Sequence, residues 1–108
     1  GQIEKEFLQK RKQLYSILRG EGYEADLIDF LNPTYQQQFD QYLYKVVGYP
    51  ALNMLGSSVF YSPYAATSLR EYFADGFEDF YLGKRRHLKE ISPVLYSKLE
   101  ELQNEENY

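Results

Sequence analysis

Apolar residues recur every three or four positions along most of this 108-residue chain, whereas strict alternation of apolar and polar residues is rare. Spacings of three, four and seven place side chains on one face of an α-helix, and alternation would place them on one face of a strand. A helix with one apolar face buries that face against other elements. The spacing therefore predicts a mainly α protein, a compact unit of about four to five helices.

Residue types that start or end helices divide the chain into segments. The predicted helices cover about 3–18, 24–31, 33–47, 69–82 and 93–102, with a short helical turn and an ordered loop in 49–68. Ser92 and Pro93 suit the cap and first position of the last helix, and Asn32 and Pro33 suit the same positions before the third. Because no linker or repeat divides the chain, we expect one domain over 1–108, with a frayed tail at 103–108.

The apolar face of each predicted helix identifies candidate core residues. These stripes are Ile3, Phe7, Leu14, Tyr15 and Leu18; Leu27, Ile28 and Leu31; Tyr35, Phe39, Tyr42, Leu43, Val46 and Val47; Leu69, Tyr72, Phe73, Gly76, Phe77 and Phe80; and Leu95, Leu99 and Leu102. The opposite face of the first helix, which carries Lys10 and Lys12, is expected to face solvent. Gly76 lies inside a stripe, where a missing side chain favours close approach of another helix.

Composition excludes several classes of protein. Hydrophobic residues make up 44% of the chain and charged residues 26%, which is too apolar for a disordered segment. No apolar run reaches the roughly 20 residues of a membrane-spanning helix, and a net charge of -4 disfavours nucleic acid as a partner. Cysteine is absent, so disulfides cannot stabilise the fold. Since Gly1 opens the chain without a signal-peptide pattern, we expect it to be part of a longer polypeptide.

The strongest functional signal lies before and within the fourth predicted helix. Tyr64 precedes the helix, Glu71 lies in its first turn, and Asp75 follows one turn later on the same face. One carboxylate can bind a metal ion, and a second can accept a proton from a histidine that binds the same ion. The three residues therefore look like half of a zinc site. The other half, usually the motif His-Glu-x-x-His, is missing from this sequence, whose single histidine is His87.

Residues around this signal match a family pattern. The pattern has two parts, Ser62-Pro63-Tyr64 and Leu69-Arg70-Glu71-Tyr72-Phe73-Ala74-Asp75-Gly76-Phe77. Together they resemble the third-ligand helix of the zinc metallopeptidases related to anthrax lethal factor, which belong to the gluzincins. The resemblance covers about the last half of the chain, because 88–102 is similar to the closing helix of that domain. It implies a fold like the C-terminal subdomain of a zincin-like peptidase.

The resemblance implies a role for each of the three residues. Glu71 corresponds to the third zinc ligand, Tyr64 to the phenol that reaches the substrate carbonyl, and Asp75 to the acid that orients a zinc-bound histidine. The resemblance implies zinc as the cofactor of the intact parent protein, a peptide or protein as its substrate, and an extracellular location. Because the histidines and the general base would lie in the missing motif, we expect this chain alone to bind no zinc and to be inactive.

The same residues have other interpretations. Ser68 and Glu71 also fit a helix-capping box, in which Glu71 would bond to the Ser68 amide. Glu71, Asp75, Glu78 and Asp79 together also fit a solvated helix face. A calcium site of Glu71, Asp75 and Glu78 is disfavoured, since one helix face cannot wrap about six to eight oxygens around an ion. The alternative function is a non-catalytic helical module that binds another protein through a tyrosine-rich surface.

Overall fold

The computed structural model describes residues 1–106, and these residues form helices joined by loops, with no strand among them. The α-helices of this part of the chain are α1 (Gln2–Gly20), α2 (Leu27–Phe30), α3 (Gln37–Gln41), α4 (Tyr49–Gly56), α5 (Leu69–Tyr81), α6 (Arg85–Ile91) and α7 (Pro93–Glu106). A π-helix, η1 (Tyr42–Val47), continues α3, and a 3-10 helix, η2 (Tyr64–Ala66), precedes α5. The predicted mainly α fold is thus confirmed.

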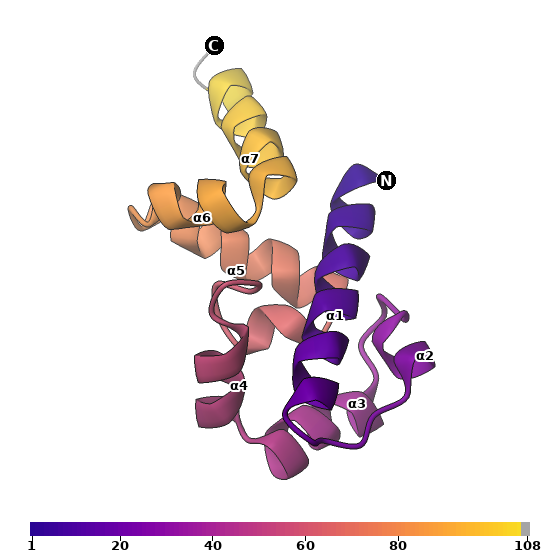
Figure 1. Cartoon of the computed structure of the whole chain (residues 1–108). Coiled ribbons are helices and arrows are strands. Elements are labelled where there is room, and N and C mark those ends of the chain that lie inside the picture. Colours follow the sequence, from indigo (N-terminus) through magenta and orange to yellow (C-terminus); the bar gives the residue numbers. More distant parts are fainter. Residues whose placement is uncertain (107–108) are drawn as a thin grey trace.

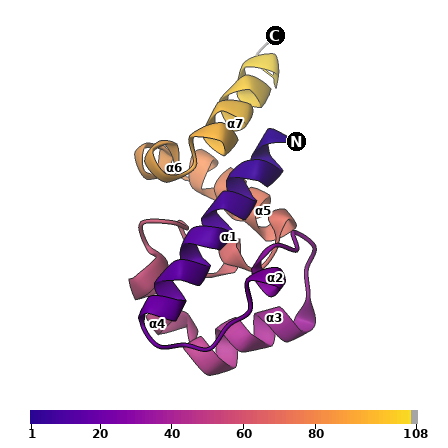
Figure 2. The same ribbon diagram turned by 45° about the vertical axis from the view of Figure 1, so that its right-hand side comes forward.

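Helix α1 runs through the middle of the molecule (Figure 1 and Figure 2). It contacts α2, α4, α5 and α7, and α5 crosses behind it in both views. Helices α6 and α7 pack on the C-terminal half of α5, so that α7 begins beside the N-terminal part of α1 and its C-terminal end points away from the rest of the molecule. The molecule measures 49 × 24 × 20 Å, and its long dimension ends at α7. No helix within residues 1–106 has the length and apolar character to cross a membrane.

Aromatic rings from distant segments meet in the core between α1 and α5. The ring centroid of Phe7 lies 5.3 Å from that of Tyr72 and 6.1 Å from that of Phe60. The fully buried aliphatic side chains extend this core along α1, η1, α6 and α7, and they are Leu14, Leu18, Leu43, Leu88, Leu95 and Leu99. Because each buried side chain of this size contributes about 1.5–3 kcal/mol, this shared core fixes α5 against α1.

The third predicted helix begins later than its sequence pattern indicates. Pro33 is not its first residue, because regular helix starts only at Gln37. The Asn32 side chain instead accepts a hydrogen bond from the Thr34 amide at 3.0 Å, which makes a turn. The Pro33 carbonyl accepts a bond from the Leu69 amide at 2.8 Å. This tertiary contact keeps the chain out of a helix and holds it against the start of α5.

Some predicted core positions are exposed because two segments do not form regular α-helix over their whole predicted length. Helix α2 is a single turn, which buries Phe30 and leaves Ile28 78% exposed. Along α3 and the π-helix η1 that continues it, the buried residues follow one another at four-residue steps, at Phe39, Leu43 and Val47, and Val46 is exposed. The other predicted stripe residues that are exposed are Leu27, Leu31, Tyr35 and Phe77.

Lys10 is buried, which corrects the prediction that its side of α1 faces solvent. Its ammonium group donates a hydrogen bond to the Val59 carbonyl at 2.8 Å. Burial lowers the pKa of Lys10, and the negative charge of Glu6 offsets part of that effect. The long aliphatic stem of a lysine packs as an apolar group, so a lysine next to an apolar stripe can extend the core.

The C-terminal part contains one helix more than predicted. Gly83 ends α5 with a positive φ of 95°, as expected of a glycine after a helix, but the chain then forms α6 before Pro93 opens α7. His87 lies exposed on α6. Helix α7 continues to Glu106, past residue 103, where the frayed tail was predicted to begin. Residues 107–108 of that predicted tail lie outside the described residues.

Candidate functional site

A short, tightly bonded turn connects Tyr64 to Glu71. The Tyr64 carbonyl accepts hydrogen bonds from the amide of Thr67 at 3.0 Å and from its hydroxyl at 2.7 Å. Ser68 is extended, with φ -164° and ψ 163°, and its hydroxyl accepts a bond from the Glu71 amide at 3.1 Å. Ser68 is therefore the N-cap of α5. These bonds fix the backbone positions of both candidate residues.

The Arg11 side chain fixes the same turn from the inside of the molecule. Its Nε donates to the Ala66 carbonyl at 2.6 Å, and its Nη2 donates to the Thr67 carbonyl at 3.0 Å. Both carbonyls belong to the stretch between Tyr64 and Glu71. Arg11 was not among the predicted site residues, although it lies four residues after Phe7 and three before Leu14, within the apolar stripe of α1. A charged residue within an apolar stripe is the sequence feature that could have identified it.

The other contacts of Arg11 join a second segment to this turn. Its Nη1 donates to the carbonyls of Phe30 at 3.2 Å and Asn32 at 3.3 Å. The guanidinium carbon also lies 4.7 Å from the ring centroid of Phe7 and 4.2 Å from that of Phe39, within cation–π range. Burial lowers the pKa of Arg11 to about 9, and at this value the group is still protonated at neutral pH.

The Tyr64 side chain is accessible and is supported by another tyrosine. Its residue surface is 57% exposed, and its ring lies 5.0 Å from the Tyr49 ring at an interplanar angle of 80°. The Tyr49 hydroxyl donates to Asp40 at 2.8 Å, which anchors the supporting ring. Within residues 1–106 the Tyr64 hydroxyl has no hydrogen-bond partner. The phenol can therefore donate to a ligand without breaking an internal bond.

Glu71 and Asp75 lie one turn apart on α5 and are both partly exposed. The Ser62 hydroxyl donates a hydrogen bond to Oδ2 of Asp75, whereas the Glu71 carboxylate has neither a hydrogen bond nor an ion pair in the described part of the chain. The predicted capping box forms only in part. The Ser68 hydroxyl accepts a hydrogen bond from the Glu71 amide, but within residues 1–106 the Glu71 carboxylate accepts none from the Ser68 amide. The Glu71 carboxylate is thus accessible and has no internal bond to lose.

A half-buried tyrosine, Tyr61, lies next to Asp75. The Tyr61 hydroxyl donates to the Tyr72 carbonyl, inside α5. The pKa of Tyr61 is raised mainly by burial, and the nearby phenol of Tyr72 and charge of Asp75 add to the effect. Tyr61 therefore stays neutral and acts as a fixed hydrogen-bond donor to the helix that carries the two acids.

The three candidate residues share one local framework but do not bond to one another. Helix α5 packs against η2, and no hydrogen bond within residues 1–106 joins Tyr64, Glu71 and Asp75. Two cavities of about 580 and 560 Å³ lie elsewhere, and neither is lined by these three residues. The contacts of Ser62 with Asp75 and of Tyr49 with Tyr64 were not predicted, because they follow no regular spacing in the sequence.

No three His, Cys, Asp or Glu side chains among the described residues are grouped so that they could hold a metal ion. Glu71, Asp75 and Glu78, considered above as calcium ligands, therefore do not form such a group. Comparison with protein-family models, with curated proteins and with solved structures finds no match to this chain. The likeness to the lethal-factor-like peptidases rests on the residue pattern alone.

Proposed function

We propose that this chain is the C-terminal part of a lethal-factor-like zinc metallopeptidase domain and contributes to peptide-bond hydrolysis. In this proposal Glu71 is one zinc ligand, Asp75 orients a histidine ligand, and Tyr64 binds the substrate carbonyl. The observation that carries the proposal is the family pattern around Glu71, combined with an accessible phenol and an unpaired carboxylate at the two ends of one rigid turn. The histidines and the general base would come from residues outside this sequence.

The chemistry of the two acids fits the proposed metal. A partly exposed carboxylate without an internal partner, as at Glu71, suits a zinc ligand. One oxygen of Asp75 accepts a hydrogen bond from Ser62, which leaves the other to accept a hydrogen bond from the ring N–H of a ligand histidine. Zinc, when bound, polarises the scissile carbonyl and activates water as the nucleophile.

Tyr64 would act on the charge that develops during hydrolysis. The carbonyl oxygen of the substrate gains negative charge as its carbon becomes tetrahedral, and a positioned phenol can donate a hydrogen bond to it. Because the Tyr49 ring contacts the Tyr64 ring, the Tyr64 side chain loses little conformational freedom when it binds the substrate. A donor of this kind contributes about 2.7–4 kcal/mol to stabilisation of the transition state.

The test uses the polypeptide extended by the residues that are naturally encoded before Gly1. We expect this longer protein to bind about one zinc and to cleave peptides. Glu71→Gln should lower its zinc content, whereas Tyr64→Phe should keep the zinc and lower kcat by about 10²–10³-fold. Zinc is measured by elemental mass spectrometry and cleavage with a peptide library.

Two variants control for general damage. Glu78→Gln removes an exposed acid from the same helix, and Tyr44→Phe alters a tyrosine that is 58% exposed and lies 5.3 Å from the same Tyr49 ring. Both should keep zinc and activity. Full zinc content and activity in Glu71→Gln would reject the assignment.

A protein-binding module is the second candidate function. Tyr35, Tyr44 and Tyr64 are each more than half exposed, and the hydroxyls of Tyr35 and Tyr49 both donate to Asp40, at 2.9 and 2.8 Å. Accessible tyrosines of this kind are frequent in protein interfaces. The discriminating observation is the sequence encoded before Gly1, because a parent without paired histidines supports this module and not the peptidase.

A further inference from the structure

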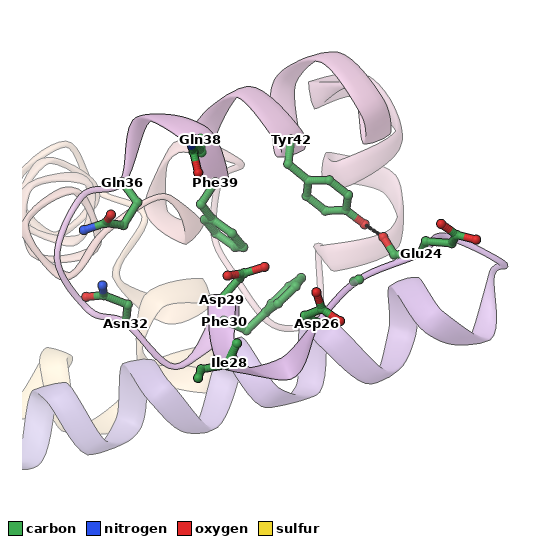
Figure 3. A pocket seen from close by; sticks show the side chains of 11 residues that line it. Glu24, Asp26, Ile28, Asp29, Phe30, Asn32, Gln36, Gln38, Phe39 and Tyr42 are labelled. Carbon is green, nitrogen blue, oxygen red and sulfur yellow. Dashed lines mark hydrogen bonds between the residues drawn. The ribbon is translucent and has the colours of Figure 1, made fainter.

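A second feature of the molecule, independent of the proposed zinc site, is a pocket of about 580 Å³ between the α2 segment and α3–η1 (Figure 3). Its floor is aromatic. Phe30 and Phe39 are nearly completely buried, their ring centroids lie 4.9 Å apart, and Tyr42 extends the floor toward η1. The volume and the apolar floor match those of pockets that bind small molecules or single side chains.

The rim of the pocket is acidic. Glu24, Asp26 and Asp29 are exposed acids of this rim, of which Glu24 directs its carboxylate away from the pocket in Figure 3, and no basic residue lines the pocket. Figure 3 shows the Asp29 carboxylate directed into the space between α2 and α3. Amide side chains complete the rim, and they are Asn32, Gln36 and Gln38. The like charges of Asp26 and Asp29 at one opening attract a cation and repel an anion.

These carboxylates do not neutralise a charge of the protein itself. The nearest buried cation is Arg11, which contacts Phe39 in the pocket floor. Its hydrogen bonds all go to main-chain carbonyls, and no acid contributes to its pKa, which burial alone lowers. Within residues 1–106, none of the three rim acids forms an ion pair. Their charge is thus available to a ligand.

We propose that this pocket binds the side chain of an arginine residue from a peptide or protein partner. A guanidinium group can stack on aromatic rings and offers five N–H donors in a plane. Tyr42, which is partly exposed, provides the ring, whereas Asp26, Asp29 and the amide oxygens provide the acceptors. The aliphatic part of the arginine would cover the exposed side chain of Ile28. A lysine has no plane to stack, so it fits this floor less well.

The experiment is a titration of the full chain with N-acetyl-arginine N-methylamide, followed by ¹H–¹⁵N NMR. We expect saturable shifts of amide signals in α2 and α3 at millimolar concentrations. The citrulline counterpart, which has nearly the same shape without the charge, should bind at least about five-fold more weakly. Asp26→Asn and Asp29→Asn should each weaken binding of the arginine probe by about two- to five-fold. Glu21→Gln, an exposed acid outside the pocket, should leave it unchanged.

Several results would overturn the inference. Equal binding of the arginine and citrulline probes, or unchanged binding in Asp26→Asn and Asp29→Asn, would remove the role of charge. Equal binding of the lysine counterpart would show a pocket for any amine, and equal binding of the leucine counterpart would show an apolar one. The absence of saturable shifts with every probe would show that this surface binds no such side chain. None of these results depends on zinc or on peptide cleavage, so the proposed peptidase function is tested separately.

Discussion

Arg11 shows how a cation can be buried in this fold without an acidic partner among residues 1–106. Its residue surface is 1% exposed, and four carbonyls from two separate segments accept its hydrogen bonds. Carbonyl groups carry only partial charges, so they satisfy the donors of the guanidinium without fully neutralising it. Arg11 therefore connects the loop after α2 to the turn before α5. The loop lines the pocket of about 580 Å³, and the turn carries the candidate zinc site.

We predict that Arg11→Met destabilises the protein by about 3 kcal/mol or more, because a methionine fills part of the space but leaves three buried carbonyls and one partly buried carbonyl without this donor. The free energy of unfolding is measured by urea denaturation. Lys12→Met is the matched control, since it removes a cation from an exposed neighbouring position of the same helix. Equal urea midpoints for Arg11→Met and the wild-type protein would show that these hydrogen bonds add no net stability.

At the scale of elements, Gly76 allows α5 and α7 to approach each other, as its position in the sequence predicted. A Cβ atom at this residue would overlap the Leu95 side chain of α7 and lie 2.9 Å from the Tyr61 hydroxyl. The packing of α7 on α5 therefore depends on the missing side chain.

Gly76→Ala should consequently destabilise the protein by about 1–3 kcal/mol. The comparison is Gly20→Ala at the end of α1, where an added Cβ meets no atom within 4 Å and a gain of up to about 1 kcal/mol is expected. Thermal unfolding followed by circular dichroism measures both. A stability of Gly76→Ala equal to that of Gly20→Ala would show that α7 can shift at no cost.

Local signals in the sequence predicted those elements whose ends are determined locally. Gly48 and Gly83, both with positive φ, end helices where expected, and Pro93 begins α7. The late start of α3 was not predictable in this way, because it depends on hydrogen bonds from Arg11 and Leu69 to the segment around Pro33. Helix α6 was missed because its two turns bury a single residue, Leu88, which is too little for a recognisable stripe.

For the candidate site too, only the local part of the arrangement was predictable. Tyr64, Glu71 and Asp75 lie within twelve consecutive residues, so their spacing and family pattern were visible in the sequence. The residues that support them come from elsewhere, because Arg11 lies on α1 and Tyr49 on α4. Contacts between such distant residues follow from the packing of whole helices, which the pattern of one segment does not specify.

At the scale of the whole molecule, Glu6 connects the first helix to the start of the last helix. Its carboxylate accepts hydrogen bonds from the amides of Val94 at 2.7 Å and Leu95 at 3.3 Å, in the first turn of α7. It also accepts one from the Tyr72 hydroxyl at 2.6 Å. Ser92 has the predicted N-cap position, but a carboxylate from α1 satisfies these amides. The negative charge also favours the N-terminus of a helix.

Glu6→Ala should therefore cost about 2 kcal/mol and loosen α7 more than the rest of the fold. Hydrogen exchange should show lower protection of amides in α7, with a smaller change in α3. Glu4→Ala, on the same helix, forms no such bonds and serves as the control. A uniform loss of protection in all helices would contradict a local capping role.

Two tyrosines with a raised pKa, Tyr61 and Tyr72, predict how the stability of the whole molecule depends on pH. Burial raises the pKa of Tyr61 and Tyr72, so the folded protein keeps both phenols protonated at a pH where the unfolded chain ionises them, near 10. The folded state then binds more protons than the unfolded state, and the free energy of unfolding falls as the pH rises above about 9.5, by up to about 1.4 kcal/mol per pH unit for each phenol. Lys10 and Arg11 act in the opposite direction, because burial lowers their pKa, but the tyrosines with raised pKa outnumber them.

Urea denaturation at several values between pH 8 and 11 should show this decrease in the free energy of unfolding. Tyr61→Phe should make the decrease less steep by the equivalent of about one proton, or about 1.4 kcal/mol per pH unit. Stability that rises over this range would mean that the two buried bases dominate.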